Sequence, residues 1–205
     1  MNDVDNEEAS APRERRPDSS HDALVLAARV GDRRALDALW RAHRRWVAAI
    51  VLAHAPRSED LEDLLQEVAA TLVAKIGTLR DPAGFRAWLR VIAVNVARAA
   101  GRRVQLRQRL APTSAPVDEV RSEPLGEAEL ERRDEVRHVL DVVLELSPDL
   151  REPLLLKCLH GLSQREIARE LDLPETTVET RLARARRTLR ERLSTQSRTT
   201  DVRHD

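Results

Sequence analysis

The sequence predicts an all-α protein built from two helical domains that a flexible linker joins. Leu and Ala, which are strong helix formers, dominate its apolar residues, whereas Tyr is absent and Phe occurs once. Apolar residues recur every three to four positions over most of the chain, which is the period of one helix face. A chain of 205 residues has room for one or two domains, each with its own core.

The N-terminal half is expected to form one domain over residues 20–110. Residues 1–19 are polar, lack periodicity and are predicted to be a disordered tail. Pro56 and the break at residues 77–82 interrupt the helical pattern of the domain, and Ser58 is expected to cap the helix that follows Pro56. The predicted helices cover residues 20–31, 32–55, 58–76 and 83–110.

Residues 111–129 separate the two halves. They contain three Pro together with small and acidic residues and show no helical period, so they are predicted to be an interdomain linker. Helical periodicity returns at about residue 127, and the second domain is expected over residues 130–194. Residues 195–205 are predicted to be a second disordered tail.

Charge is segregated along the chain although the formal net charge is zero. Residues 84–110 carry seven Arg and no acid, and residues 181–192 carry six Arg against one Glu. Acids gather instead at residues 58–67 and 118–135. A polyanion responds to the field within about 8–10 Å, so the two basic segments are compatible with DNA or RNA binding.

A single cysteine, Cys158, excludes an internal disulfide and indicates a reducing compartment. No second pair of ligands stands at metal-binding spacing, so no metal or cofactor is expected, and Cys158 is predicted to be a small core residue. The first twenty residues do not read as a signal peptide, and the longest apolar run, residues 46–53, is too short to span a bilayer. A soluble cytoplasmic protein is expected.

A helix-turn-helix pattern occupies residues 161–193. Ser163 and Glu166 have the spacing of a capping box, and residues 172–174 make the turn. In the following helix the steps of three and four define a buried side of Val178, Leu182, Ala185 and Leu189. The opposite side offers short polar groups and guanidinium groups at a spacing that suits a major groove: Thr176, Glu179, Thr180, Ala183, Arg184 and Arg187. The alternative is a merely solvated basic helix face.

Residues 146–189 resemble region 4, the C-terminal DNA-binding region of bacterial RNA polymerase sigma factors of the extracytoplasmic-function (ECF, sigma-70) type. Stand-alone regulators use a similar helix pair, so this segment alone is ambiguous. The residues that carry the resemblance are Gly161, Leu162, Ser163, Glu166, Ile167, Ala168, Leu171, Thr177, Val178, Arg181 and Leu182, followed by Arg184, Ala185 and Arg186.

The N-terminal half resembles region 2 of the same family. "GDRRALDALW" at residues 31–40 looks like its start. "SEDLEDLLQEV" at residues 58–68 is similar to the stretch that docks on the clamp helices of the polymerase β′ subunit. "FRAWLRVIAVNVARAAGRR" at residues 85–103 resembles the segment that melts and reads the −10 element. Both resemblances occur in the order that the family has.

The resemblance implies three sets of site residues. Asp63, Gln66 and Glu67 are expected to bind core polymerase. The −10 element is assigned to Phe85, Trp88, Arg90, Asn95, Arg98, Arg102 and Arg103, in which the arginines would hold phosphates. The −35 element is assigned to Thr176, Thr177, Glu179, Thr180, Arg181, Ala183, Arg184, Arg186 and Arg187.

Within the −35 set, the chemistry of each side chain suggests a role. Arg184 is the best candidate for a bidentate contact to guanine, and Thr180 and Glu179 are candidates for neighbouring bases. Arg186 and Arg187 are candidates for phosphates.

The aromatic residues of the −10 set have an alternative. Phe85 and Trp88 lie near the buried stripe of their helix, so core packing competes with a role against bases. Base–aromatic stacking contributes roughly 1–3 kcal/mol per base. Two aromatic residues therefore open little duplex, and most of the opening energy is expected to come from polymerase binding.

The resemblance implies an alternative sigma factor that binds core RNA polymerase, through the β′ clamp helices and the β flap, and directs it to promoter DNA. No enzymatic activity is expected, because no phosphate loop or nucleophile–base pair is recognisable. An anti-sigma factor is a candidate partner that the sequence does not identify. The alternatives are a stand-alone helix-turn-helix regulator and a helical protein-interaction module.

Overall fold

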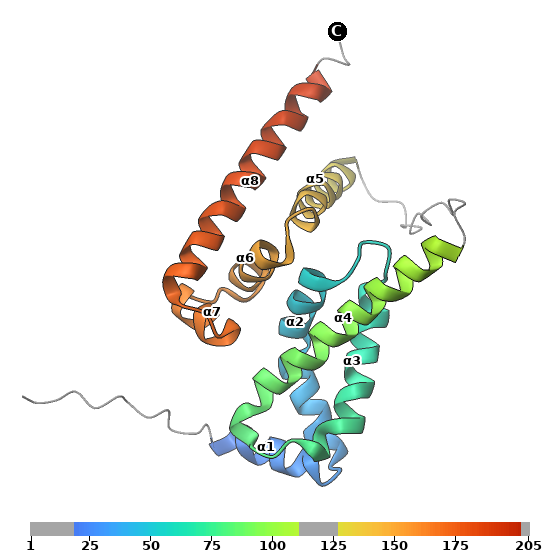
Figure 1. Ribbon diagram of the computed structural model, residues 1–205, viewed down its shortest axis with the longest axis vertical. Coiled ribbons are helices and arrows are strands. Elements are labelled where there is room, and N and C mark those ends of the chain that lie inside the picture. Colours follow the sequence, from blue (N-terminus) through green and yellow to red (C-terminus); the bar gives the residue numbers. More distant parts are fainter. Residues whose placement is uncertain (1–18, 111–126, 202–205) are drawn as a thin grey trace, which may run out of the picture.

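The computed structural model describes residues 19–110 and 127–201, and within these ranges every regular element is a helix. The all-α prediction is therefore confirmed for this part of the chain. The helices form two lobes, an N-terminal lobe of α1 to α4 and a C-terminal lobe of α5 to α8 (Figure 1). The predicted tail at residues 1–18, the linker at 111–126 and the last four residues, 202–205, lie outside the described residues.

The N-terminal lobe contains α1 (Ser19–Arg29), α2 (Arg33–His54), α3 (Leu61–Lys75) and α4 (Phe85–Leu110), with single 3-10 turns at Ile76–Thr78 and Pro82–Gly84. Asp32 caps α2 by accepting the backbone N–H of Arg34 at 2.8 Å. Asp60, and not Ser58, caps α3, because its carboxylate accepts the N–H of Glu62 at 2.7 Å and that of Asp63 at 3.1 Å.

The C-terminal lobe contains α5 (Glu127–Leu144), α6 (Pro148–His160), α7 (Gln164–Leu171) and α8 (Glu175–Asp201). The predicted capping box is present: the Glu166 N–H donates to Ser163 Oγ at 3.2 Å, and the Ser163 N–H donates to Glu166 Oε2 at 2.8 Å. α5 begins at Glu127, inside the range predicted as linker, and α8 extends to Asp201, inside the range predicted as a C-terminal tail.

One hydrophobic core runs through both lobes. Its largest fully buried side chains include Trp46, Phe85 and Leu89 in the N-terminal lobe and Leu156 and Leu182 in the C-terminal lobe. The most extensive contact between two helices joins α2 of the first lobe to α6 of the second, which lie next to each other in Figure 1. The two lobes are thus packed together in this structure.

Cys158 corrects a further expectation, because its side chain is exposed and not in the core. Residues 151–156 of α6 are all buried, and α6 contacts both α2 and α8. This helix is therefore buried on more than one side, and its helical period does not show whether Cys158 faces the core or the solvent. Within the described residues, no group of three or more His, Cys, Asp or Glu could hold a metal ion.

Candidate nucleic-acid and polymerase interfaces

α8 presents a polar face to solvent and packs its apolar face against the lobe. Val178, Leu182 and Ala185 are fully buried, as the helical period predicted. Thr177 and Arg181 are half-buried, at the border of the two faces. The other residues of the predicted −35 set are exposed: Thr176, Glu179, Thr180, Ala183, Arg184, Arg186 and Arg187. The exposed face can therefore reach DNA while the helix stays anchored.

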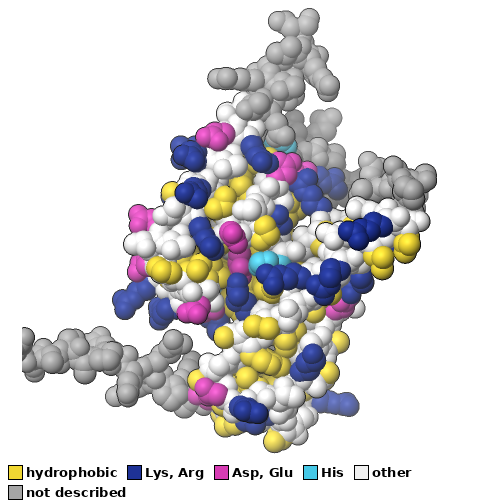
Figure 2. All heavy atoms as spheres, in the orientation of Figure 1, with side chains coloured by type: hydrophobic (Ala, Val, Ile, Leu, Met, Phe, Trp, Pro, Cys, Tyr) yellow, Lys and Arg dark blue, Asp and Glu magenta, His cyan; other side chains and the backbone are white. Residues whose placement is uncertain are grey.

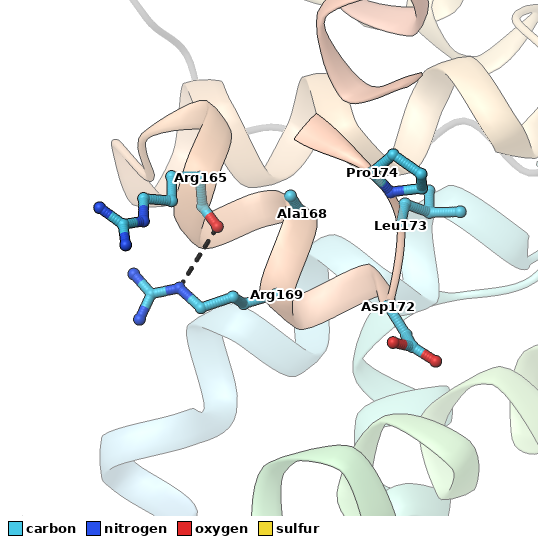
Figure 3. Close-up of a pocket in the computed structure, with 6 residues that line it drawn as sticks. All are labelled: Arg165, Ala168, Arg169, Asp172, Leu173 and Pro174. Carbon is cyan, nitrogen blue, oxygen red and sulfur yellow. Dashed lines mark hydrogen bonds between the residues drawn. The ribbon is translucent and has the colours of Figure 1, made fainter. Parts of the chain in front are cut away.

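α7, the helix before the turn, adds two basic side chains that sequence reasoning missed. A pocket of about 350 Å³ is lined by Arg165, Ala168, Arg169, Asp172, Leu173 and Pro174 (Figure 3). In Figure 3 the guanidinium groups of Arg165 and Arg169 lie side by side on the outer side of α7, and Arg169 Nε donates to the Arg165 carbonyl at 3.4 Å. Two arginines four residues apart were a readable sign of a basic face.

Asp172 makes the turn possible with an unusual backbone conformation. Its φ is 53° and its ψ is 50°, in the left-handed region that glycine adopts most readily. Asp tolerates this region better than most residues. The turn directs the chain from α7 into α8, and the N–H of Leu173 donates to the carbonyl of Ala168 at 2.9 Å.

α4 carries the predicted −10 residues, which differ in exposure and in the contacts they make. Asn95, Arg98 and Arg102 are exposed, and Trp88 is half-buried. Arg90 and Arg103 are engaged in ion pairs with acids on other helices. Figure 2 shows dark-blue Lys and Arg side chains on the face that it displays, with several magenta acids among them. The exposed arginines of α4 suit a nucleic-acid backbone.

Phe85 has to be removed from the −10 set. Its side chain is 0% exposed, and its ring packs against the rings of His43 and His21 with centroids 5.1 and 5.6 Å apart. The alternative of core packing is therefore the correct one for Phe85. The sequence placed the residue on its helix but could not show which neighbouring helix covers it.

His43 belongs to the same ring cluster. Burial lowers the pKa of His43, and the hydrogen bond from its Nδ1 to the carbonyl of Leu39 at 2.9 Å opposes that effect. The nearby His21 and Arg86 lower the pKa further, because they disfavour a second positive charge. The neutral ring is thus the form that fits the core.

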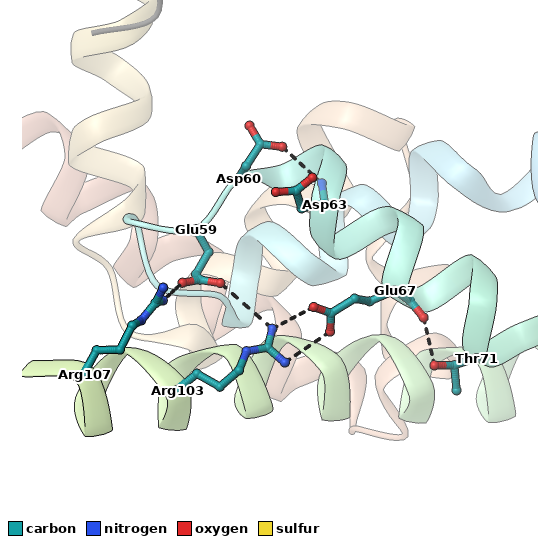
Figure 4. Close-up of polar contacts among 7 residues, drawn as sticks. All are labelled: Glu59, Asp60, Asp63, Glu67, Thr71, Arg103 and Arg107. Carbon is teal, nitrogen blue, oxygen red and sulfur yellow. Dashed lines mark hydrogen bonds and ion pairs between the residues drawn. The ribbon is translucent and has the colours of Figure 1, made fainter. Parts of the chain in front are cut away.

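The predicted polymerase-binding residues lie on the exposed side of α3. Asp63, Gln66 and Glu67 are all exposed, whereas the neighbouring Leu64, Leu65 and Val68 are buried. Figure 4 shows that Glu67 faces α4, where Arg103 binds its carboxylate at 2.8 and 3.3 Å. Arg103 also lies 4.0 Å from Glu59, which pairs with Arg107. This network joins the acidic helix to the basic helix.

A second ion-pair network joins the lobes, and its central residue is Glu152 of α6. Arg90 of α4 donates from Nε and Nη2 to the two carboxylate oxygens at 2.9 and 2.8 Å. His54 of α2 contacts Oε2 through Nε2 at 3.0 Å. Burial raises the pKa of the Glu152 carboxyl, but the hydrogen bonds from His54 and Arg90 outweigh it and hold the pKa below its usual value. Sequence reasoning missed Glu152.

Arg151, the neighbouring residue, docks on the end of α2. Pro56 has no N–H, so the carbonyl of Leu52, four residues earlier, lacks its partner within the helix. Arg151 Nη1 donates to this carbonyl at 3.2 Å, and Nη2 donates to the carbonyl of Leu146 at 2.6 Å. A guanidinium of one lobe thus satisfies a helix end of the other.

A helix-turn-helix with a polar outer face and a separate helical lobe with a basic helix together define a two-lobed, nucleic-acid-binding helical protein. Comparison with known families agrees with this description. Residues 39–107 match the family model "Sigma-70 region 2", and residues 137–189 match "Sigma-70, region 4". Among the described helices, none has both the length and the apolar composition that a membrane span requires.

Similar proteins cover most of the chain. The ECF RNA polymerase sigma-E factor of Haemophilus influenzae is 32% identical over 171 residues, which are 80% of this chain and 90% of that protein. The sigma-E factor of Escherichia coli K12 is 32% identical over 178 residues, covering 80% and 88%. The solved structure of CnrH in complex with the cytosolic domain of CnrY has a TM-score of 0.59 and 26% identity, and it covers 86% of this chain and 98% of that one.

The chain therefore belongs to the ECF sigma factors of the sigma-70 family. It is an alternative sigma factor, which binds core RNA polymerase and directs transcription initiation at promoter DNA. The match to region 2 as well as region 4 sets aside the stand-alone regulator, which needs only the helix-turn-helix.

Proposed function

We propose that the two lobes divide promoter recognition between them. In the C-terminal lobe, α8 reads the −35 element through Arg184, Thr180 and Glu179, and Arg186 and Arg187 hold phosphates. The observation that carries this assignment is the exposed polar face of α8, backed by the fully buried Val178, Leu182 and Ala185. Arg165 and Arg169, beside the turn, add phosphate contacts to the same surface.

In the N-terminal lobe, α4 captures the −10 strand. Arg98 and Arg102 are exposed cations for the backbone, and Asn95 and the half-buried Trp88 are the candidates for bases. Arg90 and Arg103 join this set once their acidic partners release them. Because Trp88 is the remaining aromatic candidate after Phe85, stacking supplies only about 1–3 kcal/mol, and polymerase binding must supply the rest of the opening energy.

α3 docks on the β′ clamp helices through Asp63, Gln66 and Glu67, and the C-terminal lobe contacts the β flap. Three exposed polar side chains within two turns of one helix support this assignment. The chain itself catalyses no bond chemistry. It acts in the cytoplasm, where it meets the polymerase.

A partner that covers both lobes is part of this proposal. CnrH was solved in complex with the cytosolic domain of CnrY, and the family resemblance includes anti-sigma factors. We infer that an anti-sigma factor holds this chain away from the polymerase until it is needed.

The decisive experiment is transcription in vitro with purified core polymerase, the full chain and a library of randomised promoters. We expect the selected start sites to share two elements at a fixed spacing. Start sites that are the same with and without the chain would contradict the proposal, and so would a palindromic footprint made by the chain without polymerase.

A further inference from the structure

We propose that the contact of Glu152 with Arg90 and His54, here called the inter-lobe ion pair, keeps the free protein in a closed and inactive conformation. Glu152 occupies the guanidinium of Arg90, which would otherwise be available to DNA. Binding to polymerase and promoter must separate the lobes and exchange the carboxylate for a phosphate. This inference rests on the proposed function, because it assigns a use to Arg90 on the −10 side.

The position of Glu152 shows that it serves the contact between the lobes. Its residue exposure is 5%, although it is an acid in the middle of a helix. Each of its hydrogen-bond partners, Arg90 and His54, belongs to the other lobe. The C-terminal lobe therefore does not need this carboxylate for its own fold, and a buried acid is costly without such partners.

The lobes also meet through the apolar contact of α2 with α6 and through the bond of Arg151 to the carbonyl of Leu52, and the remaining ion pairs between them are more exposed. Arg57 reaches Asp141 at 3.6 Å and Glu145 at 3.8 Å, but these side chains are about half exposed and such pairs stabilise little. Arg86 of α4 lies 3.1 Å from Glu170 of α7. Arg86 and Arg90 lie one turn apart on α4. In the closed form, two arginines of the basic segment are therefore paired with acids of the other lobe.

The closed conformation is too small to read both promoter elements. Positions −35 and −10 differ by about 25 base pairs, which is about 85 Å of duplex at 3.4 Å per pair. A compact chain of this length measures about 45 Å across, from the usual scaling of size with length. The lobes, which share one core here, must therefore part before α8 and α4 can occupy the two elements together.

The exchange is chemically simple. The guanidinium of Arg90 makes a two-point contact with a carboxylate, and a phosphate offers the same geometry. Its side chain remains 27% exposed, so it can turn to solvent without unfolding its helix. Glu152 becomes hydrated when the lobes part, so the open form does not bury an unpaired charge.

The test measures the distance between the lobes in the full chain by fluorescence energy transfer. The chain has one cysteine, Cys158, which is exposed on α6 and carries the first label. Val73→Cys adds a second labelling site on α3, where Val73 is 58% exposed. We expect high transfer in the free protein and a loss of transfer when core polymerase is added. Glu152→Gln should raise the ratio of open to closed protein by at least about tenfold.

The matched control is Asp149→Asn, which removes an exposed acid from the same helix and should leave the transfer unchanged. Equal transfer in Glu152→Gln and Asp149→Asn would overturn the proposal. If Glu152→Gln loses its helical circular dichroism, Arg90→Gln tests the same contact from the other lobe, and closed-like transfer in that variant would also overturn it.

A binding measurement separates this inference from the proposed function. Polymerase binds the open form, and a larger open fraction raises the apparent affinity in proportion. Glu152→Gln should therefore bind core polymerase more tightly than wild type, by the same factor as its gain in open protein. If the variant opens and binds more tightly but transcription is not promoter-specific, the proposed function fails and the closed state stands. If the variant stays closed, the inference fails whatever the transcription assay gives.

Discussion

Arg103 of α4 and Glu67 of α3 form a two-point ion pair, with Nη2 2.8 Å from Oε1 and Nη1 3.3 Å from Oε2. The pair connects the helix proposed to hold the −10 strand with the helix proposed to dock on polymerase. Both side chains are nearly half exposed, so the pair orients the helices and adds little to stability.

Glu67→Ala should therefore weaken binding to core polymerase by about tenfold or more while changing the free energy of unfolding by less than about 1 kcal/mol. Binding is measured by titration with labelled protein, and stability by urea denaturation. Asp37→Ala is the control, because Asp37 is an exposed acid in an ion pair with Arg41 on α2. Equal polymerase affinity of the two variants would remove Glu67 from the docking surface.

Arg184→Ala should reduce affinity for the cognate −35 element by about 1–3 kcal/mol and relax the preference at one base pair. Arg187→Ala should weaken binding to all sequences alike and lower the salt dependence. Both are measured with the polymerase holoenzyme on a set of single-base promoter variants. An unchanged base preference in Arg184→Ala would show that another side chain reads the guanine.

Phe85→Ala should cost about 3–5 kcal/mol of stability, because it empties a fully buried site between α4 and the ring cluster. Trp88→Ala, at a half-buried position, should cost less stability and should instead slow promoter opening. Chemical denaturation and permanganate footprinting of the melted strand separate the two effects. A stable Phe85→Ala protein that cannot open promoters would reinstate Phe85 as a contact to bases.

Acid should destabilise the N-terminal lobe through His43. The folded-state pKa of His43 lies below 6.5, so the unfolded chain binds more protons in the interval between the two values. The free energy of unfolding should therefore fall as pH drops below about 6.5. His43→Gln should lose less stability than wild type between pH 7.5 and 5.5.

Glu152 affects the free energy of unfolding at a lower pH than His43 does, so the two effects can be separated. Its folded-state pKa is depressed, so its contribution is present above about pH 4.5 and is lost as pH falls through the folded-state value. Denaturation curves at pH 7.5, 5.5 and 4 resolve them. An equal pH dependence of wild type and His43→Gln above pH 5 would contradict the assignment to His43.

Asp172→Gly should stabilise the C-terminal lobe by about 0.5–1 kcal/mol, because the residue has a φ of 53° and glycine adopts that conformation without a clash from Cβ. Asp172→Ala keeps the Cβ and should give no such gain. Thermal unfolding of both variants decides the matter. A gain in both would point to the lost carboxylate and away from the backbone.

Local rules explain what could be predicted from the sequence. The capping box at Ser163 and Glu166 and the buried side of α8 each depend on residues within a few positions of one another. The exposed faces of α3 and α8 follow from the same helical period. The family resemblance then supplied the candidate roles for these faces, which the described side chains allow for all but Phe85.

Contacts between distant segments explain what could not be predicted. Glu152 meets Arg90 and His54 only because α6 packs across the N-terminal lobe, and no local pattern encodes that choice. Cys158 was misplaced because α6 is covered on more than one side. Ser58 and Asp60 are both residue types that cap helices, and in the structure it is Asp60 whose side chain accepts the first N–H groups of α3.

Pro56 has an effect beyond ending its helix. By withholding an amide from the carbonyl of Leu52 it leaves an acceptor, and Arg151 of the other lobe uses it. An alanine at this position would let α2 continue, and its N–H would donate to the carbonyl of Leu52. Arg151 would then have to donate to water instead. One imino acid in the first half of the chain thereby prescribes where a side chain from the second half comes to rest.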